Sequence, residues 1–190
     1  MSLTAWPLAG DETIERDEEE RLIEYAKSDR EARGDLYRQH YSTVYRFVHR
    51  RVGNRHDADD IVSDVFLAMV KNLHRFHHRG VPFRAWLYRL AITQLSRWSR
   101  RRRRLAVQQL DDMSKHEDPQ NDDTRLDSEM VEIVLLTLPP RLQTVLTLHY
   151  LAEMSVKEIA EVLICRSGTV KSRLSRARQL MRERLSKKGR

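Results

Sequence analysis

The sequence predicts an all-α protein with two small helical domains joined by a flexible acidic linker, and three observations support this fold class. Apolar residues recur at helical spacing, and no segment alternates with the period of a strand for long. Six Gly and five Pro among 190 residues are few for the many tight turns of an all-β chain. Acidic and basic residues form separate blocks, so that an acidic stretch lies between two basic helical segments.

Composition excludes several classes of protein. Lys and Arg total 35 against 28 Asp and Glu, a formal charge of +7 that favours a polyanionic partner. The single cysteine, Cys165, excludes an internal disulfide and a multi-cysteine zinc site. No apolar run approaches the roughly 20 residues that cross a bilayer, and the N-terminus lacks a signal-peptide pattern. We therefore expect no membrane insertion and a cytoplasmic location.

The first predicted helix ends at Gly53-Asn54. Its apolar face comprises Tyr37, Tyr41, Val44, Tyr45, Val48 and Val52. Gly and Asn both tolerate the left-handed conformation that commonly ends a helix. Asp57 is then expected to cap the next helix.

Two further helices complete a bundle over residues 29–104. The second is expected to bury Ile61, Val62, Val65, Phe66, Met69, Val70 and Leu73. A polar connection from His74 to Gly80 follows, and Pro82 suits a first helical turn. The third is expected to bury Phe83, Trp86, Leu87, Leu90, Ala91 and Leu95. Three helices with short connections are typical of a compact bundle.

Residues 105–125 are predicted to form the flexible linker, because they lack apolar periodicity and are rich in Asp. In the second domain, residues 126–190, a helix that buries Ile133 and Val134 is stopped by Pro139-Pro140. Another helix follows, and then Ser155 and Glu158 match the S-x-x-E capping box of a third. Ser167 is expected to cap the last helix.

The last two helices have the pattern of a helix-turn-helix. Ten Lys or Arg and one Glu lie between Arg166 and Arg190. Such a block repels itself unless a polyanion offsets it. The side chains that suit base and phosphate contacts near the start of the last helix are Arg166, Ser167, Thr169, Lys171, Ser172, Arg173 and Arg176. An amphipathic hairpin that packs on another protein is the alternative.

Five strings in this chain resemble extracytoplasmic-function (ECF) sigma factors, the small specificity subunits of bacterial RNA polymerase. LPPRLQTVL (138–146), SVKEIA (155–160) and GTVKSRLSRAR (168–178) resemble their region four. DADDIVSDVF (57–66) and FRAWLYRLA (83–91) resemble their region two. Both modules occur in the family's order. The resemblance implies no catalytic residue, metal or cofactor in this chain, because catalysis belongs to the polymerase.

The resemblance implies that the second helix docks on the clamp helices of the largest polymerase subunit. The matching positions are Asp60, Ile61, Asp64, Val65, Leu67 and Ala68. Acidic side chains beside apolar ones suit a small dry contact with basic partner residues. The alternative is that Asp60 and Asp64 only favour the N-terminal end of their helix.

The resemblance assigns the −10 promoter element to the segment that starts near His77. The expected DNA contacts are Arg79, Arg84, Tyr88, Arg89, Thr93, Arg97, Arg100 and Arg101. An unstacked base needs an aromatic platform, for which Trp86, Tyr88 and Trp98 are the candidates. The alternative places Trp86 and Trp98 in the core, which helical spacing favours for Trp86, so we expect Tyr88 to be the exposed candidate. Many relatives carry Asn and Asp at Thr93 and Arg97, so the −10 preference is expected to differ.

Region four is expected to read the −35 element and to meet the polymerase flap. The linker resembles the connector that threads toward the polymerase active site. Most family members are controlled by an anti-sigma factor, often held at the membrane, which covers the same faces.

Two segments depart from the family pattern. The break at Leu163-Ile164-Cys165 has no Gly, so Ile164 must turn without a left-handed residue, or the turn is altered. Residues 1–28 form an acidic extension without a match. Both disorder and mimicry of DNA against a basic face remain open for it.

Other classes of function explain less of the sequence. His74, His77 and His78 with Cys165 would be the donors of a zinc enzyme, but their spacing is not that of a standard ligand set. A dimeric helix-turn-helix regulator that binds operators would leave the first bundle unexplained. Cys165 is either a redox switch or a small apolar residue that fills the helix break.

Overall fold

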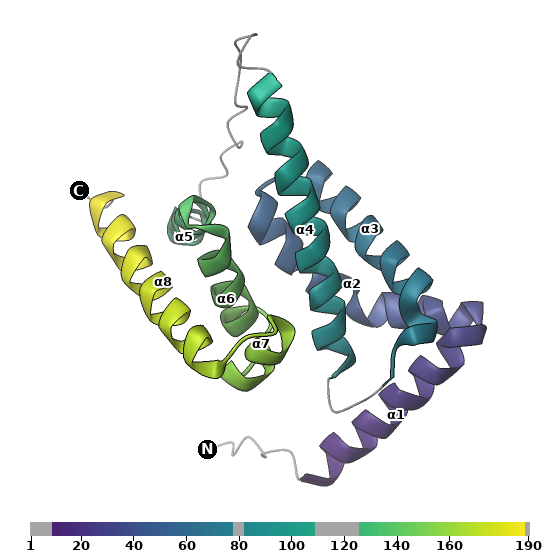
Figure 1. Cartoon of the computed structure of the whole chain (residues 1–190). Helices are drawn as coiled ribbons and strands as arrows, with labels where there is room; N and C mark the ends of the chain where they lie inside the picture. Colours follow the sequence, from purple (N-terminus) through teal and green to yellow (C-terminus); the bar gives the residue numbers. More distant parts are fainter. Residues whose placement is uncertain (1–8, 78–81, 109–125, 189–190) are drawn as a thin grey trace.

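The structure is a computed structural model that describes residues 9–77, 82–108 and 126–188, with side chains described for 17–77, 82–105 and 130–187. Every regular element in these residues is helical (Figure 1), which confirms the all-α prediction. The elements are α1 (Ala9–Ser28), α2 (Arg30–Val52), α3 (Arg55–Asn72), η1 (Leu73–Arg75), α4 (Phe83–Gln108), α5 (Leu126–Thr137), α6 (Pro140–Tyr150), α7 (Val156–Val162) and α8 (Ser167–Lys188). The predicted linker over 105–125 starts too early, because residues 105–108 belong to α4, which continues to Gln108, so the predicted start at 105 is wrong. Residues 109–125 lie outside the described residues. No described helix is long and apolar enough to cross a membrane.

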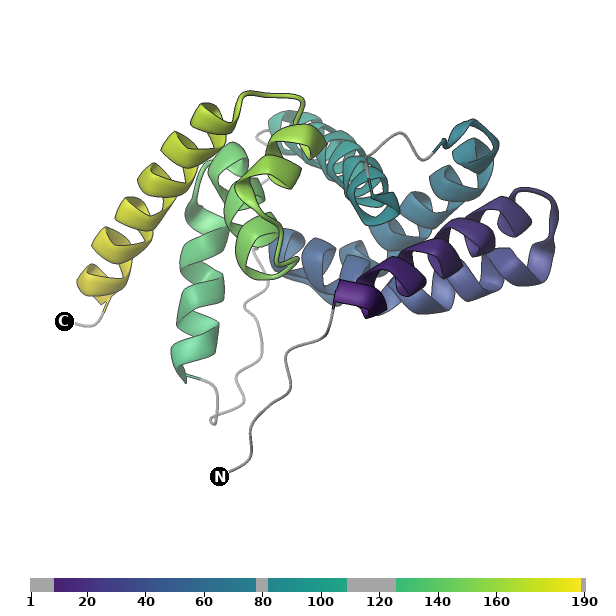
Figure 2. The ribbon, with the colours of Figure 1, turned by 90° about the horizontal axis from the view of Figure 1, so that it is seen from below.

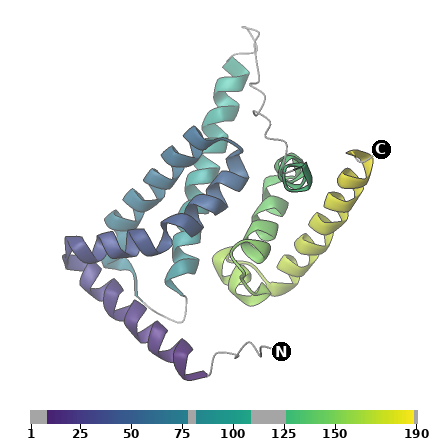
Figure 3. The same ribbon diagram turned by 180° about the vertical axis from the view of Figure 1, so that it is seen from behind.

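Helices α1 to α4 form one bundle, and α5 to α8 form a second group beside it (Figures 1 and 3). Phe47, Met69, Phe83 and Leu87 are almost fully buried in the first bundle. The predicted helical faces are confirmed at most positions. The predicted burial of Val70 is wrong, because its side chain is 46% exposed at the edge of α3. The predicted burial of Ile133 is also wrong, because its side chain on α5 is 40% exposed.

The junction between α2 and α3 is set by two adjacent residues. Gly53 has a φ of +76°, and its N–H donates to the carbonyl of His49 at 2.9 Å, which ends α2 as predicted. The side chain of Asn54 accepts from the backbone N–H of Asp57 at 2.8 Å. The cap of α3 is therefore Asn54, and the assignment of Asp57 is wrong because Asp57 already lies within the helix.

Helix α1 is part of the first bundle. It packs against α2 and η1, and Ile23 and Ala26 are 2% and 0% exposed. Arg33 on α2 donates to the carbonyl of Ala26 at 3.1 Å. The alternative that this extension is disordered is therefore wrong for residues 17–28. The spacing of Ile23 and Ala26, three residues apart, is the sequence signal that would have predicted this packing.

Within the second group of helices, α7 and α8 form a helix-turn-helix. The side chain and backbone of Ser155 form both hydrogen bonds of the predicted capping box with Glu158. Ile164, in the turn between the helices, has a φ of +50° and is 83% exposed. The expectation of a turn without a left-handed residue is wrong: Ile164 itself adopts that conformation, which is costly for a β-branched residue.

The two groups are in direct contact. Helix α4 packs against α7, and α2 packs against α5 and α6, as the view from below shows (Figure 2). Among the described side chains, three pairs cross the boundary besides this packing: Arg50–Glu132, Arg51–Thr144 and Arg84–Glu158.

Candidate nucleic-acid and polymerase interface

Helix α3 presents part of the predicted docking set to solvent. Asp60 and Asp64 are exposed, Leu67 is 57% exposed, and Ala68 is half-buried. Ile61 and Val65 are 3% and 0% exposed, because their spacing turns them toward the interior of the bundle. The expectation that these two residues contact a partner is therefore wrong, and they instead hold the helix in place.

A shallow apolar groove lies beside Leu67, between α2 and α3. Its volume is about 520 Å³, and Tyr37, Val70, Arg30 and Arg33 are among the residues that line it. Tyr37 and Val70 are 42% and 46% exposed. The sequence pattern predicted that both side chains lie on a buried face. Their position at the edge of that face is the only signal that could have distinguished them from its buried residues.

The predicted stacking residue Tyr88 is buried. Its exposed fraction is 3%, and its ring centroid lies 5.0 Å from that of Phe47 on α2. Burial raises the pKa of the Tyr88 hydroxyl to about 12. The expectation that Tyr88 is exposed to stack on a base is wrong, because position 88 falls on the face of α4 that packs against α2. Trp86 is half-buried and packs on Phe83 with ring centroids 5.4 Å apart.

The C-terminal half of α4 carries a run of exposed cations, and Arg84 near the start of the helix is exposed as well. Arg97, Arg100 and Arg101 are exposed, and Arg102 lies 5.3 Å from the ring centroid of the half-buried Trp98. Thr93 is exposed, and its hydroxyl donates to the carbonyl of Arg89 at 2.8 Å. The predicted contact Arg79 lies outside the described residues.

The N-terminal half of α4 faces α7 with two of its predicted DNA contacts. Arg84 forms a hydrogen-bonded ion pair with Glu158. Arg89 donates to the carbonyl of Glu161, and its Nε donates to the carbonyl of Val162 at 3.3 Å. Both acceptors are in the last turn of α7, where carbonyls lack helical partners. Burial alone would raise the pKa of Glu158, but hydrogen bonds from Ser155 and Arg84 hold it below its ordinary value.

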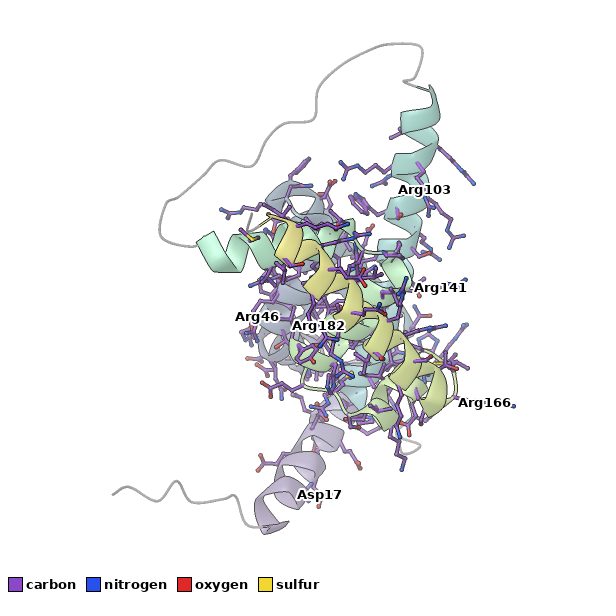
Figure 4. All side chains as sticks on the ribbon, turned by 90° about the vertical axis from the view of Figure 1, so that its left-hand side faces the viewer. Asp17, Arg46, Arg103, Arg141, Arg166 and Arg182 are labelled. Atoms are coloured by element: carbon purple, nitrogen blue, oxygen red, sulfur yellow. The ribbon has the colours of Figure 1, made fainter. Side chains whose placement is uncertain are left out.

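Helix α8 and Arg166, the residue before it, carry the predicted duplex contacts. Arg166, Ser167, Lys171, Ser172 and Arg176 are exposed, while Thr169 and Arg173 are half-buried. Ser167 is the first residue of the helix rather than the residue before it. Arg103, Arg141 and Arg166 lie along one edge of the molecule, and Asp17 lies apart on α1 (Figure 4).

Among the described residues, no three His, Cys, Asp or Glu side chains lie close enough together to hold a metal ion. His74 and His77 lie in or just after η1, and Cys165 follows Ile164 in the turn before α8. His78 lies outside the described residues.

Two family models match the chain. The model of Sigma-70 region 2 matches residues 36–105, and the model of Sigma-70, region 4 matches residues 128–181. The first match begins within α2, so α1 lies outside both. Together the matches cover well over half of the chain.

Individual relatives agree with these matches. The chain is 32% identical to the ECF RNA polymerase sigma factor SigE of Mycolicibacterium smegmatis over 160 residues, which are 80% of this chain but only 61% of SigE. It is 28% identical to the ECF RNA polymerase sigma factor SigW of Bacillus subtilis, covering 87% of this chain and 95% of SigW. It is 30% identical to the ECF RNA polymerase sigma-E factor of Haemophilus influenzae, covering 87% of this chain and 97% of that protein.

Two solved structures share the fold. CnrH in complex with the cytosolic domain of CnrY superposes with a TM-score of 0.68 at 25% identity, covering 87% of this chain and 95% of CnrH. The sigma factor RpoE of Bartonella quintana, in complex with the anti-sigma factor NepR, gives a TM-score of 0.67 at 21% identity, over 80% of this chain and 97% of RpoE. With two matched modules in the family's order and full-length relatives at 30% identity, the chain belongs to the ECF RNA polymerase sigma factors.

Proposed function

We propose that this chain binds core RNA polymerase and directs promoter-specific transcription initiation, with region 2 reading the −10 element and region 4 reading the −35 element. One observation carries the proposal: a single chain presents a basic helix-turn-helix in α7 and α8 together with an exposed acidic and apolar face on α3. A DNA-binding regulator needs the first feature, and only a subunit of a larger machine needs both.

Docking on the polymerase clamp helices is assigned to the exposed part of α3. Asp60 and Asp64 attract basic partner residues, and Leu67 and Ala68 supply the apolar contact. The groove beside Leu67 extends this contact toward Tyr37 and Val70.

Reading of the −10 element is assigned to α4. Arg97, Arg100 and Arg101 provide a cationic track for the DNA backbone, and Trp98 replaces Tyr88 as the aromatic candidate because its side chain is not fully buried. Arg84, whose side chain is 47% exposed beside Glu158, lies at the start of this track, and Arg89 is half-buried against α7.

Reading of the −35 element is assigned to the first turns of α8. Arg166 just before α8, and Lys171 and Arg176 within it, are exposed and suit phosphate oxygens or the edge of guanine. The same module is expected to meet the polymerase flap.

We assign the catalysis of transcription and the control of this chain to its partner proteins. Bond formation belongs to the polymerase, so this chain is proposed to be an initiation factor without catalytic residues, acting in the cytoplasm where the polymerase works. Control by an anti-sigma factor, in some cases held at the membrane, is supported by the solved complexes of CnrH with CnrY and of RpoE with NepR.

Transcription in vitro on a library of promoters tests this function. Core polymerase with this chain is expected to produce transcripts from a subset that shares one −10 and one −35 sequence, whereas core polymerase alone does not select them. If the purified chain instead binds duplex operators without polymerase and adds no promoter selection, a stand-alone regulator is the correct interpretation.

A further inference from the structure

A cleft of about 870 Å³ lies between the two groups of helices, and its lining comes from α2 and α4 on one side and from α5, α6 and α8 on the other (Figure 1). Cavities of about 300–1,000 Å³ at the junction of two domains are common binding sites for small molecules. The described lining of this cleft contains no Asp or Glu but five arginines, which are Arg51, Arg102, Arg103, Arg141 and Arg173. The cleft is therefore strongly cationic.

The five arginines of the cleft have no counter-charge in the described part of the chain, where none of them forms an ion pair with a carboxylate. Two of them bind neutral oxygens instead. Arg51 donates to the hydroxyl of Thr144 at 2.6 Å, and Arg103 donates to the carbonyl of Ser99 at 3.3 Å. Like charges that line one cleft repel one another. A ligand with several negative charges removes this repulsion.

Arg51 is the arginine of the cleft whose charge is least well satisfied. Its Nε is buried and has no hydrogen-bond partner among the described residues, and burial lowers the pKa of the side chain to about 10. The guanidinium still carries its charge at neutral pH, so the wall of the cleft holds a desolvated cation. Such a cation is costly unless an anion or hydrogen bonds offset its lost hydration. An anion in the cleft supplies this compensation.

The lining of the cleft has an apolar part as well as a cationic one, and both lie along α4. Ile92 and Leu95 line the cleft on the N-terminal side, and Arg102 and Arg103 line it near the C-terminal end of the helix. From Ile92 to Arg103 the helix rises about 16 Å. Trp98 lies between these two parts, is half-buried, and has its ring centroid 5.3 Å from the guanidinium carbon of Arg102. The lining therefore suits a ligand with an aromatic ring at one end and negative charge at the other.

We propose that this cleft binds a free nucleotide with two or more phosphates, whose base packs on Trp98 and Leu95 and whose phosphates lie among the arginines. Arginine is well suited to phosphate, because its planar guanidinium binds two oxygens at once. Inorganic phosphate leaves the apolar part of the lining uncovered. Duplex DNA does not enter, because a volume of 870 Å³ corresponds to a sphere about 12 Å across, which is only the width of the major groove.

Calorimetric titration of the purified full chain with ATP and with GTP at physiological salt tests the site. At least one of the two is expected to give saturable one-to-one binding and to raise the melting temperature of the chain. Arg103→Gln with Arg141→Gln is expected to weaken this binding about tenfold, since each arginine contributes one charged contact from the rim of the cleft. Neither residue is among the expected DNA contacts, so this variant leaves those contacts in place.

A matched control separates binding in the cleft from general attraction to a basic protein. Arg46→Gln with Arg104→Gln removes the same charge from two exposed arginines outside the described lining. Arg46 lies on the other side of the view from Arg103 and Arg141 (Figure 4). The control is expected to change the affinity less than twofold. If both double variants weaken binding equally, or if neither nucleotide binds the wild type at millimolar concentration, the proposal is wrong.

The contribution of the base is tested at Trp98. Trp98→Leu is expected to weaken nucleotide binding about fivefold and to leave the binding of inorganic tripolyphosphate unchanged, because only the nucleotide has a base to stack. Trp98→Phe keeps an aromatic ring and is expected to retain most of the affinity, and the melting temperatures of both variants report whether they fold. Equal affinity of the wild type for tripolyphosphate and for the nucleotide would overturn the role of the base. A single-stranded oligonucleotide that displaces the nucleotide at a lower concentration of phosphate than the nucleotide itself would show that the cleft is a DNA surface instead.

One consequence of the site rests on the proposed function. Trp98 is assigned to the −10 element and Arg173 to the −35 element, and both line the cleft. The nucleotide that binds is therefore expected to weaken promoter binding by polymerase holoenzyme, and Arg103→Gln with Arg141→Gln is expected to relieve this inhibition. Binding of the nucleotide without competition supports the site and removes Trp98 and Arg173 from the promoter contacts. Loss of promoter selection in the absence of any nucleotide overturns the proposed function, whereas the calorimetric result does not depend on it.

Discussion

Arg84 on α4 and Glu158 on α7 form an ion pair between residues that are 74 positions apart in the chain. The same carboxylate accepts from the backbone N–H of Ser155 at 2.9 Å and so completes the capping box of α7. One side chain therefore orders the start of the helix-turn-helix and joins it to the bundle of region 2.

Acid is expected to weaken this arrangement. The pKa of Glu158 is lower in the folded chain than its ordinary value of 4.5, because the hydrogen bonds from Ser155 and Arg84 outweigh burial. Such a carboxyl adds stability above its unfolded pKa and loses it as the pH falls through the folded pKa. The free energy of unfolding of the wild type should exceed that of Glu158→Gln most at neutral pH, with a difference that shrinks in acid below about 4.5. Urea titrations of both proteins measure it, and a difference that is constant with pH would contradict the assignment.

On α3, the residues that bind core polymerase and the residues that stabilise the fold are expected to be different. Leu67→Ala should weaken the affinity for core polymerase about tenfold, the scale of one buried apolar contact at an interface, without changing the melting temperature. Ile61→Ala should instead lower the free energy of unfolding by about 2–5 kcal/mol, because Ile61 is 3% exposed within the bundle. Polymerase affinity and thermal unfolding are measured on both variants. Equal effects of both variants on both measurements would show that the docking face is elsewhere.

Upstream promoter recognition is expected to depend on α8. Arg176 is exposed and donates to the side chain of Gln179 at 2.9 Å, while Arg173 is half-buried at the cleft. Alanine at either position should weaken binding of polymerase holoenzyme to −35 duplex by about 1–3 kcal/mol and leave core binding unchanged. Lys187→Ala, near the far end of α8, is the control. A parallel loss of core affinity would show that this helix has a different role.

The turn of the helix-turn-helix is expected to be stabilised by glycine. Ile164 adopts a left-handed conformation, which costs a residue with a Cβ about 1–2 kcal/mol, and its exposed side chain contributes little packing in return. Ile164→Gly loses part of this gain to the entropy of the unfolded chain. A net increase of about 0.5–1 kcal/mol in the free energy of unfolding is expected in urea titrations. Destabilisation would show that the Ile164 side chain stabilises the turn.

The helices of each region follow from local sequence, because apolar spacing and caps are local. Phe83, Leu87 and Ala91 recur at helical spacing and are buried as predicted. The capping box at Ser155 is likewise formed by residues three apart. The left-handed conformation of Ile164 could not be predicted, because Gly and Asn are the residues whose presence in a sequence indicates such a conformation.

The assignment of individual site residues depended on tertiary contacts, which local patterns do not contain. Tyr88 and Arg89 are neighbours in the sequence, but Phe47 on α2 buries the first and α7 binds the second. Ile61 and Leu67 lie on the same predicted docking helix, yet the bundle covers only Ile61. The pair Arg84–Glu158 depends on how two regions pack, and nothing in either segment specifies that packing.

Association of the purified full chain with core RNA polymerase tests the central claim most directly. Titration of core polymerase into the chain, labelled at Lys71→Cys in a Cys165→Ala background, should give saturable one-to-one binding that promoter DNA strengthens. Asp60→Ala with Leu67→Ala should weaken it. A chain that remains free at every polymerase concentration, while it binds duplex DNA alone, would contradict the account.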